Sequence, residues 1–364
     1  MSKITDKSLV TNRRRVLTAM GAGAAALAFP TVLTPRKTRA AQRIVIRDPG
    51  GPFTKAFDEA FYKPFTKETG IEAVGVPGQA EPTAQIKAMV ETKSYTWDMA
   101  DITPAATNLL VAGGYLEKLE MDKEPEVQEI PAQYKSPYMI GAEVYATVLA
   151  YRTDVYPAKG PVPDGGWKDL WDVKRIPGRR GVRKSPQDTY EIALLADGVA
   201  KDKVYPCDAT RALKKLDELK PNVSIWWTSG AQTSQMLKTG ELDMCVTWNG
   251  RAQAATDEGG PVAISWNQAL WSYEGWAILK GGPNVDACRK FIKFALNAQR
   301  QAAWTKDMTY GPTNPNAYKY IDPKRAELLP TNPKHMQSML KIDDDYWGKA
   351  KDDEITRFNE WILK

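Results

Sequence analysis

The sequence predicts an α/β fold of two lobes that are joined by two crossing segments, with a ligand cleft between them. Three observations predict this fold. Short apolar strands alternate with amphipathic helices along most of the chain, which is typical of a sheet with crossover helices. Two extended runs rich in β-branched and aromatic residues, 144–151 and 263–276, are suited to pass between the lobes. The length of 364 residues leaves room for two or three domains.

The first lobe is predicted from two separate parts of the chain, residues 42–148 and 268–364. Its clearest helix is expected at 53–68, because four phenylalanines recur there every four residues on one face. The other elements of this lobe are expected as strands at 43–47, 71–76 and 99–102, and as helices at 82–92, 104–112, 285–296, 300–306 and 349–363.

The second lobe is predicted as an insertion at residues 150–264. Its elements are expected as strands at 181–183 and 243–247, and as helices at 167–171, 188–199, 209–219 and 232–239. Because only the two extended runs would connect the lobes, they are expected to act as a hinge, with the ligand in the cleft.

The first 40 residues are predicted as a signal peptide for the twin-arginine (Tat) export machinery. Three arginines at 13–15 are followed by two apolar residues and a mildly apolar stretch rich in Ala and Gly, with a cleavage site expected near Ala40. The competing interpretation is an amphipathic helix or a membrane anchor, but Pro30 interrupts the apolar run. The formal net charge of +6 is concentrated in this segment, so bulk charge gives no reason to expect a nucleic-acid partner.

Metal and redox chemistry have little support in the sequence. His335 is the single histidine, which argues against a His-rich metal site and against a His-based catalytic triad. Three cysteines, Cys207, Cys245 and Cys288, would allow one disulfide or three buried thiols, and the sequence does not decide between them. We therefore expect a metal-free site without a cofactor.

A catalytic role is the less favoured class of function. The common glycine-rich nucleotide motif, the hydrolase nucleophile elbow, the HExxH zinc motif and the CxxC motif are all missing from the sequence. Paired carboxylates could still serve acid–base catalysis, so an exported enzyme remains a remote alternative to a binding protein.

Several segments resemble one family of transport proteins. They are Phe65-Thr-Lys-Glu-Thr-Gly-Ile71, Pro177-Gly-Arg-Arg-Gly181, Thr247-Trp-Asn-Gly250, Glu274-Gly-Trp-Ala-Ile278 and Tyr310-Gly-Pro-Thr-Asn-Pro315. The chain resembles the periplasmic solute-binding proteins of ABC importers, most of all the spermidine/putrescine-binding branch of family 1 extracellular solute-binding proteins. This resemblance implies a type II periplasmic binding protein fold. It also implies a periplasmic monomer that delivers a small amine-containing solute to a membrane permease.

The same resemblance implies which residues bind the ligand. Trp248, in the Trp-Asn-Gly segment with Asn249, matches the family's stacking tryptophan, and Glu274 matches an acid that takes one amine. Asp188, Thr103 and Tyr310 match further positions of the site. From chemistry alone, tryptophans at strand ends suit a cationic ligand through cation–π contacts, which adds Trp227 and Trp271, although each could equally pack in the core.

Two departures from the family pattern favour an alternative ligand. Pro49-Gly50-Gly51-Pro52 stands where the family has an aromatic pair, and Ser185 stands where it has an acid. Gly51 and Ser229 precede predicted helix starts, where exposed N–H groups bind anions. Three arginines near strand ends or helix starts, Arg47, Arg183 and Arg251, could clamp an anion or be ordinary surface charges. A zwitterion such as an ω-amino acid, or another carboxylate, is therefore the alternative to a polyamine.

Overall fold

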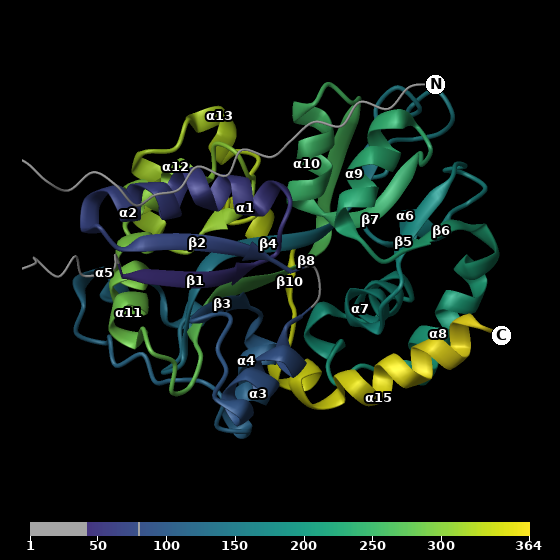
Figure 1. Ribbon diagram of the computed structural model, residues 1–364. Coiled ribbons are helices and arrows are strands. Elements are labelled where there is room, and N and C mark those ends of the chain that lie inside the picture. The colour runs from purple at the N-terminus through teal and green to yellow at the C-terminus, as the bar shows by residue number, and fades with distance from the viewer. Residues whose placement is uncertain (1–41, 79–80) are drawn as a thin grey trace, which may run out of the picture. The chain divides into compact units, whose positions relative to one another are not determined.

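The computed structural model describes residues 42–78 and 81–364 (Figure 1). The predicted Tat signal peptide falls on residues 1–40, outside the described ranges, and it stays a prediction. Within those ranges, no helix combines the length and the apolar character that crossing a membrane requires.

Ten strands form one mixed sheet with the order β2-β1-β3-β8-β4-β7-β5-β6, to which β9 and β10 add short pairings. Their bounds are β1 Arg43–Asp48, β2 Glu72–Pro77, β3 Met99–Ile102, β4 Met139–Arg152, β5 Arg180–Arg183, β6 Val223–Trp227, β7 Met244–Trp248, β8 Val262–Ile278, β9 Gly311–Pro312 and β10 Leu340–Lys341. Strands β1, β2 and β3 are parallel to one another, as are β5, β6 and β7. The long antiparallel pair β4 and β8 lies between these two groups.

The helices connect and cover these strands. Their bounds are α1 Pro52–Phe57, α2 Lys63–Thr69, α3 Thr83–Thr92, α4 Pro104–Ala112, α5 Pro125–Gln128, α6 Lys168–Trp171, α7 Pro186–Ala196, α8 Ala209–Leu219, α9 Gly230–Thr239, α10 Asn249–Asp257, α11 Val285–Ala295, α12 Ala298–Trp304, α13 Pro323–Ala326, α14 Pro333–Met336 and α15 Asp344–Ile362. A π-helical turn, Asp58–Tyr62, joins α1 to α2, so the helix expected at 53–68 is confirmed as one helical run with an irregular middle.

The two long strands β4 and β8 carry the chain between the parallel groups. They pair from Met139 to Arg152, but the register shifts between Thr147 and Leu149, where residues of β8 bulge out. Gln268 in this bulge has a φ of 60°, and its side-chain and backbone oxygens accept hydrogen bonds from the backbone and indole N–H groups of Trp167. The extended runs expected at 144–151 and 263–276 are therefore confirmed as strands, and their pairing is irregular midway.

The apolar core divides along β4. Side chains of β4 up to Val148 join those of β1, β2, β3, α1 and α11 in one cluster. Leu149 instead joins a second cluster with β5, α7 and α8, and Ala150 joins a third with α9 and α10. The predicted lobe limits stay a prediction, although this division of the core near residue 149 is compatible with two lobes.

Helix α15 contacts helices that follow strands of both parallel groups. It packs against α4 at one end and against α7 and α8 toward the other, and Figure 1 shows it extending between them. Its Trp347, Phe358 and Trp361 belong to the second apolar cluster. Gly348 faces α4, where a Cβ atom would make an ordinary contact, 3.4 Å from the backbone oxygen of Ala105.

The three cysteines are buried free thiols. The alternative of three buried small side chains is therefore the one that the structure has, and none of the three forms a disulfide.

Candidate functional site

A cleft of about 210 Å³ lies where five strands, β1, β3, β5, β6 and β7, present their carboxyl ends. Ligands of open α/β sheets bind at such edges, because the loops and helix starts that follow the strands converge there. The cleft is lined by Arg47, Pro49, Gly50, Gly51, Pro52, Phe53, Glu81, Thr103, Glu143, Tyr145, Arg183, Gln187, Thr228, Ser229, Gly230, Ala231, Trp248, Arg251, Glu274, Tyr310 and Lys351.

Six of the ten residues expected to bind ligand line this cleft. They are Gly51, Thr103, Ser229, Trp248, Glu274 and Tyr310. The sheet brings them together from both predicted lobes, because Thr103 and Glu274 come from the β3–β8 side and Ser229 and Trp248 from the β6–β7 side. Their contact with a ligand stays a prediction.

The remaining four residues lie behind the cleft and hold its walls. Asp188 is 1% exposed and accepts a hydrogen bond from Arg183, 2.6 Å away. Trp227 packs edge to face against Trp248, with 5.4 Å between the ring centroids, and its indole N–H donates to a backbone carbonyl. Trp271 lies in the core, edge to face with Tyr134.

Asn249 ties the wall of the cleft to the sheet. Its side-chain oxygen accepts a hydrogen bond from the backbone N–H of Ala146 at 2.9 Å, and its amide donates to the backbone oxygen of Thr309 at 2.6 Å. Gly250 completes this part of the motif, because a Cβ atom there would lie 2.7 Å from the ring of Tyr310. The Trp-Asn-Gly segment thus places one aromatic wall and anchors the loop that carries another.

Replacing Asn249 by alanine is expected to lower the free energy of unfolding by about 2–3 kcal/mol, because a buried N–H and a buried carbonyl lose their partner. Urea denaturation of the purified variant measures this loss. The control Asn359→Ala, on an exposed face of α15, should stay close to the parent protein. Equal stability of the two variants would contradict the anchoring role of Asn249.

Four aromatic rings form the walls between the two ends of the cleft: Phe53, Tyr145, Trp248 and Tyr310. The rings of Phe53 and Tyr310 lie 5.1 Å apart, and Tyr145 approaches Tyr310 edge to face at 6.5 Å. The Arg183 guanidinium lies 5.0 Å from the centroid of the Trp248 ring. Such walls suit the methylene groups of a short aliphatic chain.

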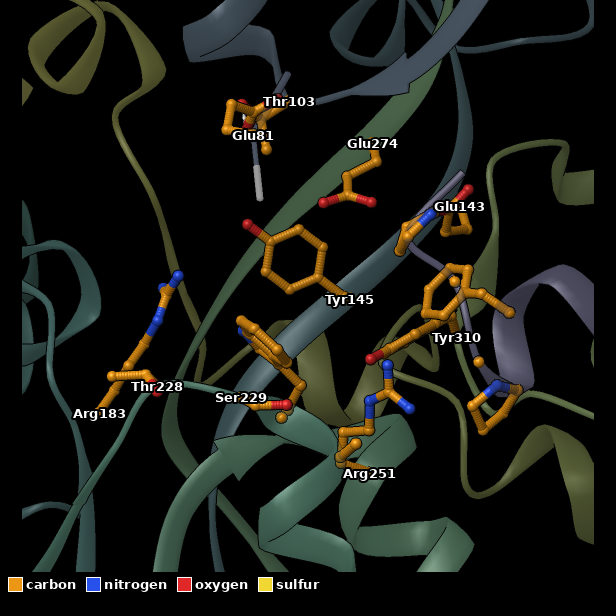
Figure 2. A pocket seen from close by; sticks show the side chains of 18 of the residues that line it. Glu81, Thr103, Glu143, Tyr145, Arg183, Thr228, Ser229, Arg251, Glu274 and Tyr310 are labelled. Atoms are coloured by element: carbon orange, nitrogen blue, oxygen red, sulfur yellow. Dashed lines mark hydrogen bonds between the residues drawn. The ribbon is translucent and has the colours of Figure 1, made fainter. Parts of the chain in front are cut away.

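One end of the cleft is acidic. Glu274 lies there with Glu143 and Glu81, and Thr103 donates a hydrogen bond to Glu81 at 3.0 Å (Figure 2). Burial, and next the negative charge of Glu81, raise the pKa of Glu274 to about 7, while arginines of the cleft oppose the shift. Ionising Glu274 costs free energy in these surroundings, and an incoming cation would stabilise the ionised form.

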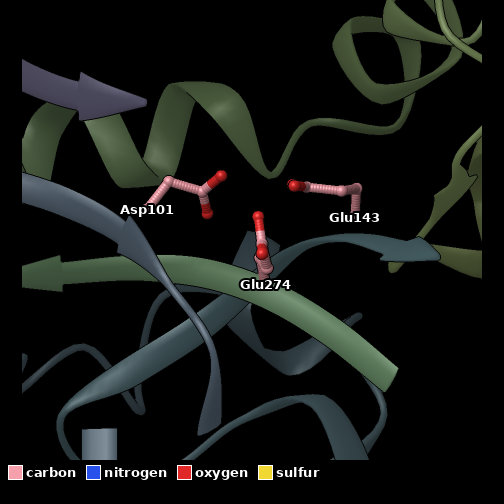
Figure 3. Close-up of side chains that lie close together, drawn as sticks. All are labelled: Asp101, Glu143 and Glu274. Carbon is pink, nitrogen blue, oxygen red and sulfur yellow. The ribbon is translucent and has the colours of Figure 1, made fainter. Parts of the chain in front are cut away.

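Next to Glu274 lie two further carboxyl groups that the sequence interpretation did not single out as site residues: Glu143, which also lines the cleft, and Asp101. Glu143 stands directly opposite Glu274 across β4 and β8, and Asp101 follows on β3. Oxygens of the three carboxyl groups lie within 4.8 Å of one another (Figure 3). Closely spaced oxygens suit a proton, an ammonium group or a hard metal ion, and the expected absence of a metal stays a prediction.

The other end of the cleft is cationic. Arg251 is 8% exposed, its guanidinium lies 5.8 Å from the centroid of the Phe53 ring, and its buried Nε has no hydrogen-bond partner among the described residues. Ser229 lies beside it at the N-cap of α9, a ten-residue helix, and makes no capping hydrogen bond with its side chain. A guanidinium next to the free N–H groups of a helix start forms a site for a carboxylate.

The two ends of the cleft carry side chains of opposite charge. Figure 2 shows Glu274 and Arg251 at opposite ends of the cleft, with the rings of Tyr145 and Tyr310 between them. The arginines weighed for anion binding all line the cleft, and both Arg47 and Arg251 are buried. Their alternative interpretation as surface charges is therefore wrong for these two.

Several lining residues were missed by the sequence interpretation, among them Glu81, Glu143, Tyr145, Gln187 and Lys351. Only Glu143 had a readable signal, because an acid within a long run of strand-forming apolar residues needs a partner or a function. Lys351 reaches the cleft from α15, far along the chain, and its position depends on how that helix packs.

Comparisons with known proteins agree with this geometry. The family model for bacterial extracellular solute-binding proteins matches residues 60–333. A gamma-aminobutyric acid-binding protein from Pseudomonas aeruginosa is 33% identical over 89% of this chain and 92% of its own length. A spermidine/putrescine-binding periplasmic protein from Escherichia coli is 23% identical over 72% of this chain and 76% of its own length.

Solved structures extend the likeness to the fold. An ABC transporter substrate-binding protein from Bradyrhizobium japonicum superposes with a TM-score of 0.83, at 36% identity, over 88% of this chain and 99% of its own. A structure described as a GABA receptor superposes with a TM-score of 0.80, at 33% identity, over 89% of this chain and 98% of its own. The predicted two-lobed α/β fold is thereby confirmed.

Proposed function

The chain belongs to the family of bacterial extracellular solute-binding proteins, the substrate-binding components of ABC transporters, and we propose that it binds a short ω-amino acid. The observation that carries this choice of ligand is the pair formed by Glu274 and Arg251 at opposite ends of one cleft. The ammonium group of the ligand contacts Glu274, its carboxylate contacts Arg251 and the start of α9, and its methylene groups lie between the aromatic walls.

Gamma-aminobutyric acid is the first ligand of this class to test. A relative and a solved neighbour, each 33% identical to this chain, carry that compound in their descriptions. The role proposed here has no catalytic step: the protein takes up the solute, closes on it and delivers it to the membrane permease. Closure follows when the ligand makes contacts on both sides of the cleft that the open form cannot make.

A polyamine is the second candidate, because three acidic side chains, Glu81, Glu143 and Glu274, gather at one end of the cleft. The more distant relatives that bind spermidine and putrescine support it. Against it stands Arg251, which would face the second ammonium group of a diamine. Like charges placed together in a buried site cost several kcal/mol.

A matched pair of ligands separates the two candidates. Gamma-aminobutyric acid and putrescine both carry an ammonium group on a short methylene chain, and they differ in whether the other end is a carboxylate or a second amine. We expect isothermal titration calorimetry to give a Kd at least about tenfold lower for the amino acid, or about 1.4 kcal/mol. Tighter binding of putrescine would overturn the ω-amino acid and establish the polyamine. Amino acids one methylene shorter and longer then measure the length that the cleft accepts.

Location and assembly complete the proposal. We propose that the chain is exported by the Tat machinery, works in the periplasm as a monomer and needs no cofactor. The periplasmic relatives support the location, and the charge pattern of residues 1–40 supports the route.

A further inference from the structure

The acidic end of the cleft contains more negative charge than one ammonium group requires. We define the carboxyl cluster as Asp101, Glu143 and Glu274, which come from β3, β4 and β8 (Figure 3). Asp101 is 0% exposed and Glu143 is 1% exposed. No N–H or O–H group of the other described residues donates to any of their four carboxyl oxygens. The only donor left for this pair is a proton that one of them carries.

The other charged groups that face the carboxyl cluster do not compensate its excess negative charge. Asp48 and Glu81 add negative charge, and Asp48 already accepts hydrogen bonds from a backbone N–H and two hydroxyl groups. Arg47, Arg183 and Arg251 oppose it. Arg47 donates hydrogen bonds to the backbone carbonyls of Asp101 and Gly78, and Arg183 is paired with the carboxylate of Asp188.

The tyrosine hydroxyl groups that face the cluster stay neutral. Burial raises the pKa of Tyr62 and of Tyr145, so neither hydroxyl group ionises near neutral pH. Burial also raises the pKa of Asp101 and of Glu143, and the negative charge of Glu274 raises both further. Two buried carboxyl groups this close do not both ionise, so Asp101 and Glu143 share a proton, and Glu274, with a pKa raised to about 7, is the cluster member that changes charge near neutral pH.

We propose that the carboxyl cluster takes up the ammonium group of its ligand in exchange for a proton. Asp101 and Glu143 are positioning residues in this exchange: they are almost fully buried beside Glu274, and their oxygens, within 4.8 Å of its own, favour a proton on it until a cation arrives. The ammonium group then replaces the proton as the positive charge next to Glu274, and the proton leaves to solvent. This inference rests on the proposed function, because it needs a cationic ligand at Glu274.

The proton that leaves can be counted by calorimetry. Gamma-aminobutyric acid is titrated into the EDTA-treated protein at pH 7 in phosphate and in Tris, two buffers with very different heats of protonation. We expect the binding enthalpy to differ between the buffers by an amount that corresponds to release of about half a proton per ligand, because a group with a pKa near the pH is half protonated. Equal enthalpies in the two buffers would overturn the exchange.

The pH profile gives a second measurement. The carboxylate and the amine of an ω-amino acid ionise near pH 4 and pH 10, so the ligand keeps its charges between pH 6 and pH 8. The pKa of Glu274 is raised to about 7, so the form that binds the cation gains population as the pH rises. We expect the affinity to rise about tenfold from pH 6 to pH 8. A flat profile would contradict the proposal.

The double variant Asp101→Asn with Glu143→Gln tests the positioning role. It keeps Glu274 and the shape of the cluster but removes the negative charge that the pair carries, so Glu274 ionises at lower pH. We expect the variant to bind with little proton release and with a flat pH profile. The matched control is Asp344→Asn, because Asp344 also has a pKa raised to about 7 but lies outside the cleft. This control should keep the proton release of the parent protein, and equal loss in both variants would overturn the assignment to the cluster.

Infrared spectroscopy supplies a readout that needs no ligand and separates this inference from the proposed function. At pH 6 the ligand-free protein should absorb more strongly than the double variant in the carbonyl band of protonated carboxyl groups. Absence of that difference overturns the inference. Absence of any heat with the amino acid, when that difference is present, overturns the proposed ligand instead.

Discussion

Replacement of Arg251 by glutamine is expected to raise the Kd for gamma-aminobutyric acid by about 30-fold or more, which corresponds to about 2 kcal/mol. Arg251 is buried beside the Phe53 ring, its Nε has no hydrogen-bond partner among the described residues, and it stands next to the free start of α9. A ligand carboxylate is the partner that would satisfy it. Removing the guanidinium leaves that carboxylate desolvated without a counter-charge.

Two further variants make the Arg251 result specific. Arg251→Lys keeps the charge but loses the planar fork that binds a carboxylate through two parallel hydrogen bonds, so we expect an intermediate loss of affinity. Arg357→Gln changes an exposed arginine on α15 and should leave the affinity unchanged. Equal affinities of the Arg251→Gln variant and the parent protein, measured by calorimetry, would remove Arg251 from the site.

Replacement of Glu274 by glutamine is expected to raise the Kd for the amine-bearing ligand at least tenfold, or about 1.4 kcal/mol. Glu274 is the member of the acidic end that faces the cleft and also changes charge near neutral pH. The glutamine keeps the shape and loses the charge that attracts the ammonium group. Calorimetry at pH 8 measures the full effect, because the parent carboxyl group is then mostly ionised.

The same Glu274 variant has a second signature. At pH 6 the parent protein itself holds a largely protonated Glu274, so the difference between the two proteins should shrink as the pH falls. Glu360→Gln, on an exposed face of α15, is the matched control and should bind like the parent at both pH values. An unchanged affinity in the Glu274 variant at pH 8 would mean that the ligand amine binds elsewhere.

The order of strands and helices could be predicted from local pattern, because most elements pack one apolar face on their immediate neighbours. The helix at 209–219 and the strand at 99–102 were predicted with the bounds that the structure has. The strand β6 was missed as an element, because Val223–Trp227 lies at the edge of the sheet and lacks a regular alternation. The start of α7 was also missed, since Gln187 and Asp188 have non-helical dihedral angles there.

The candidate site could be predicted in part for a different reason. Trp248 ends β7 and Glu274 lies within β8, and both strands border the cleft. Their positions in the sequence were therefore enough to bring them together. Trp271 and Trp227 have the same residue type at comparable positions, and which side of the sheet a ring faces depends on strand register. Asp101 and Glu143 depend on pairings of β3, β4 and β8 that connect distant parts of the chain.

Helix α15 has a mechanical consequence for the way this protein would close on its ligand. Helix α15 spans from α4 to α7 and α8. Together with β4 and β8 it therefore makes three connections, and not two, between the groups of elements on either side of the cleft. If β4 and β8 alone joined the two groups, the groups could rotate freely relative to each other. Helix α15, which packs against α4 near its start and is anchored by Trp361 at its far end, must bend or slide with any such rotation. Lys351 lies on the same helix and lines the cleft, so any movement of α15 would also move a charged side chain of the cleft wall.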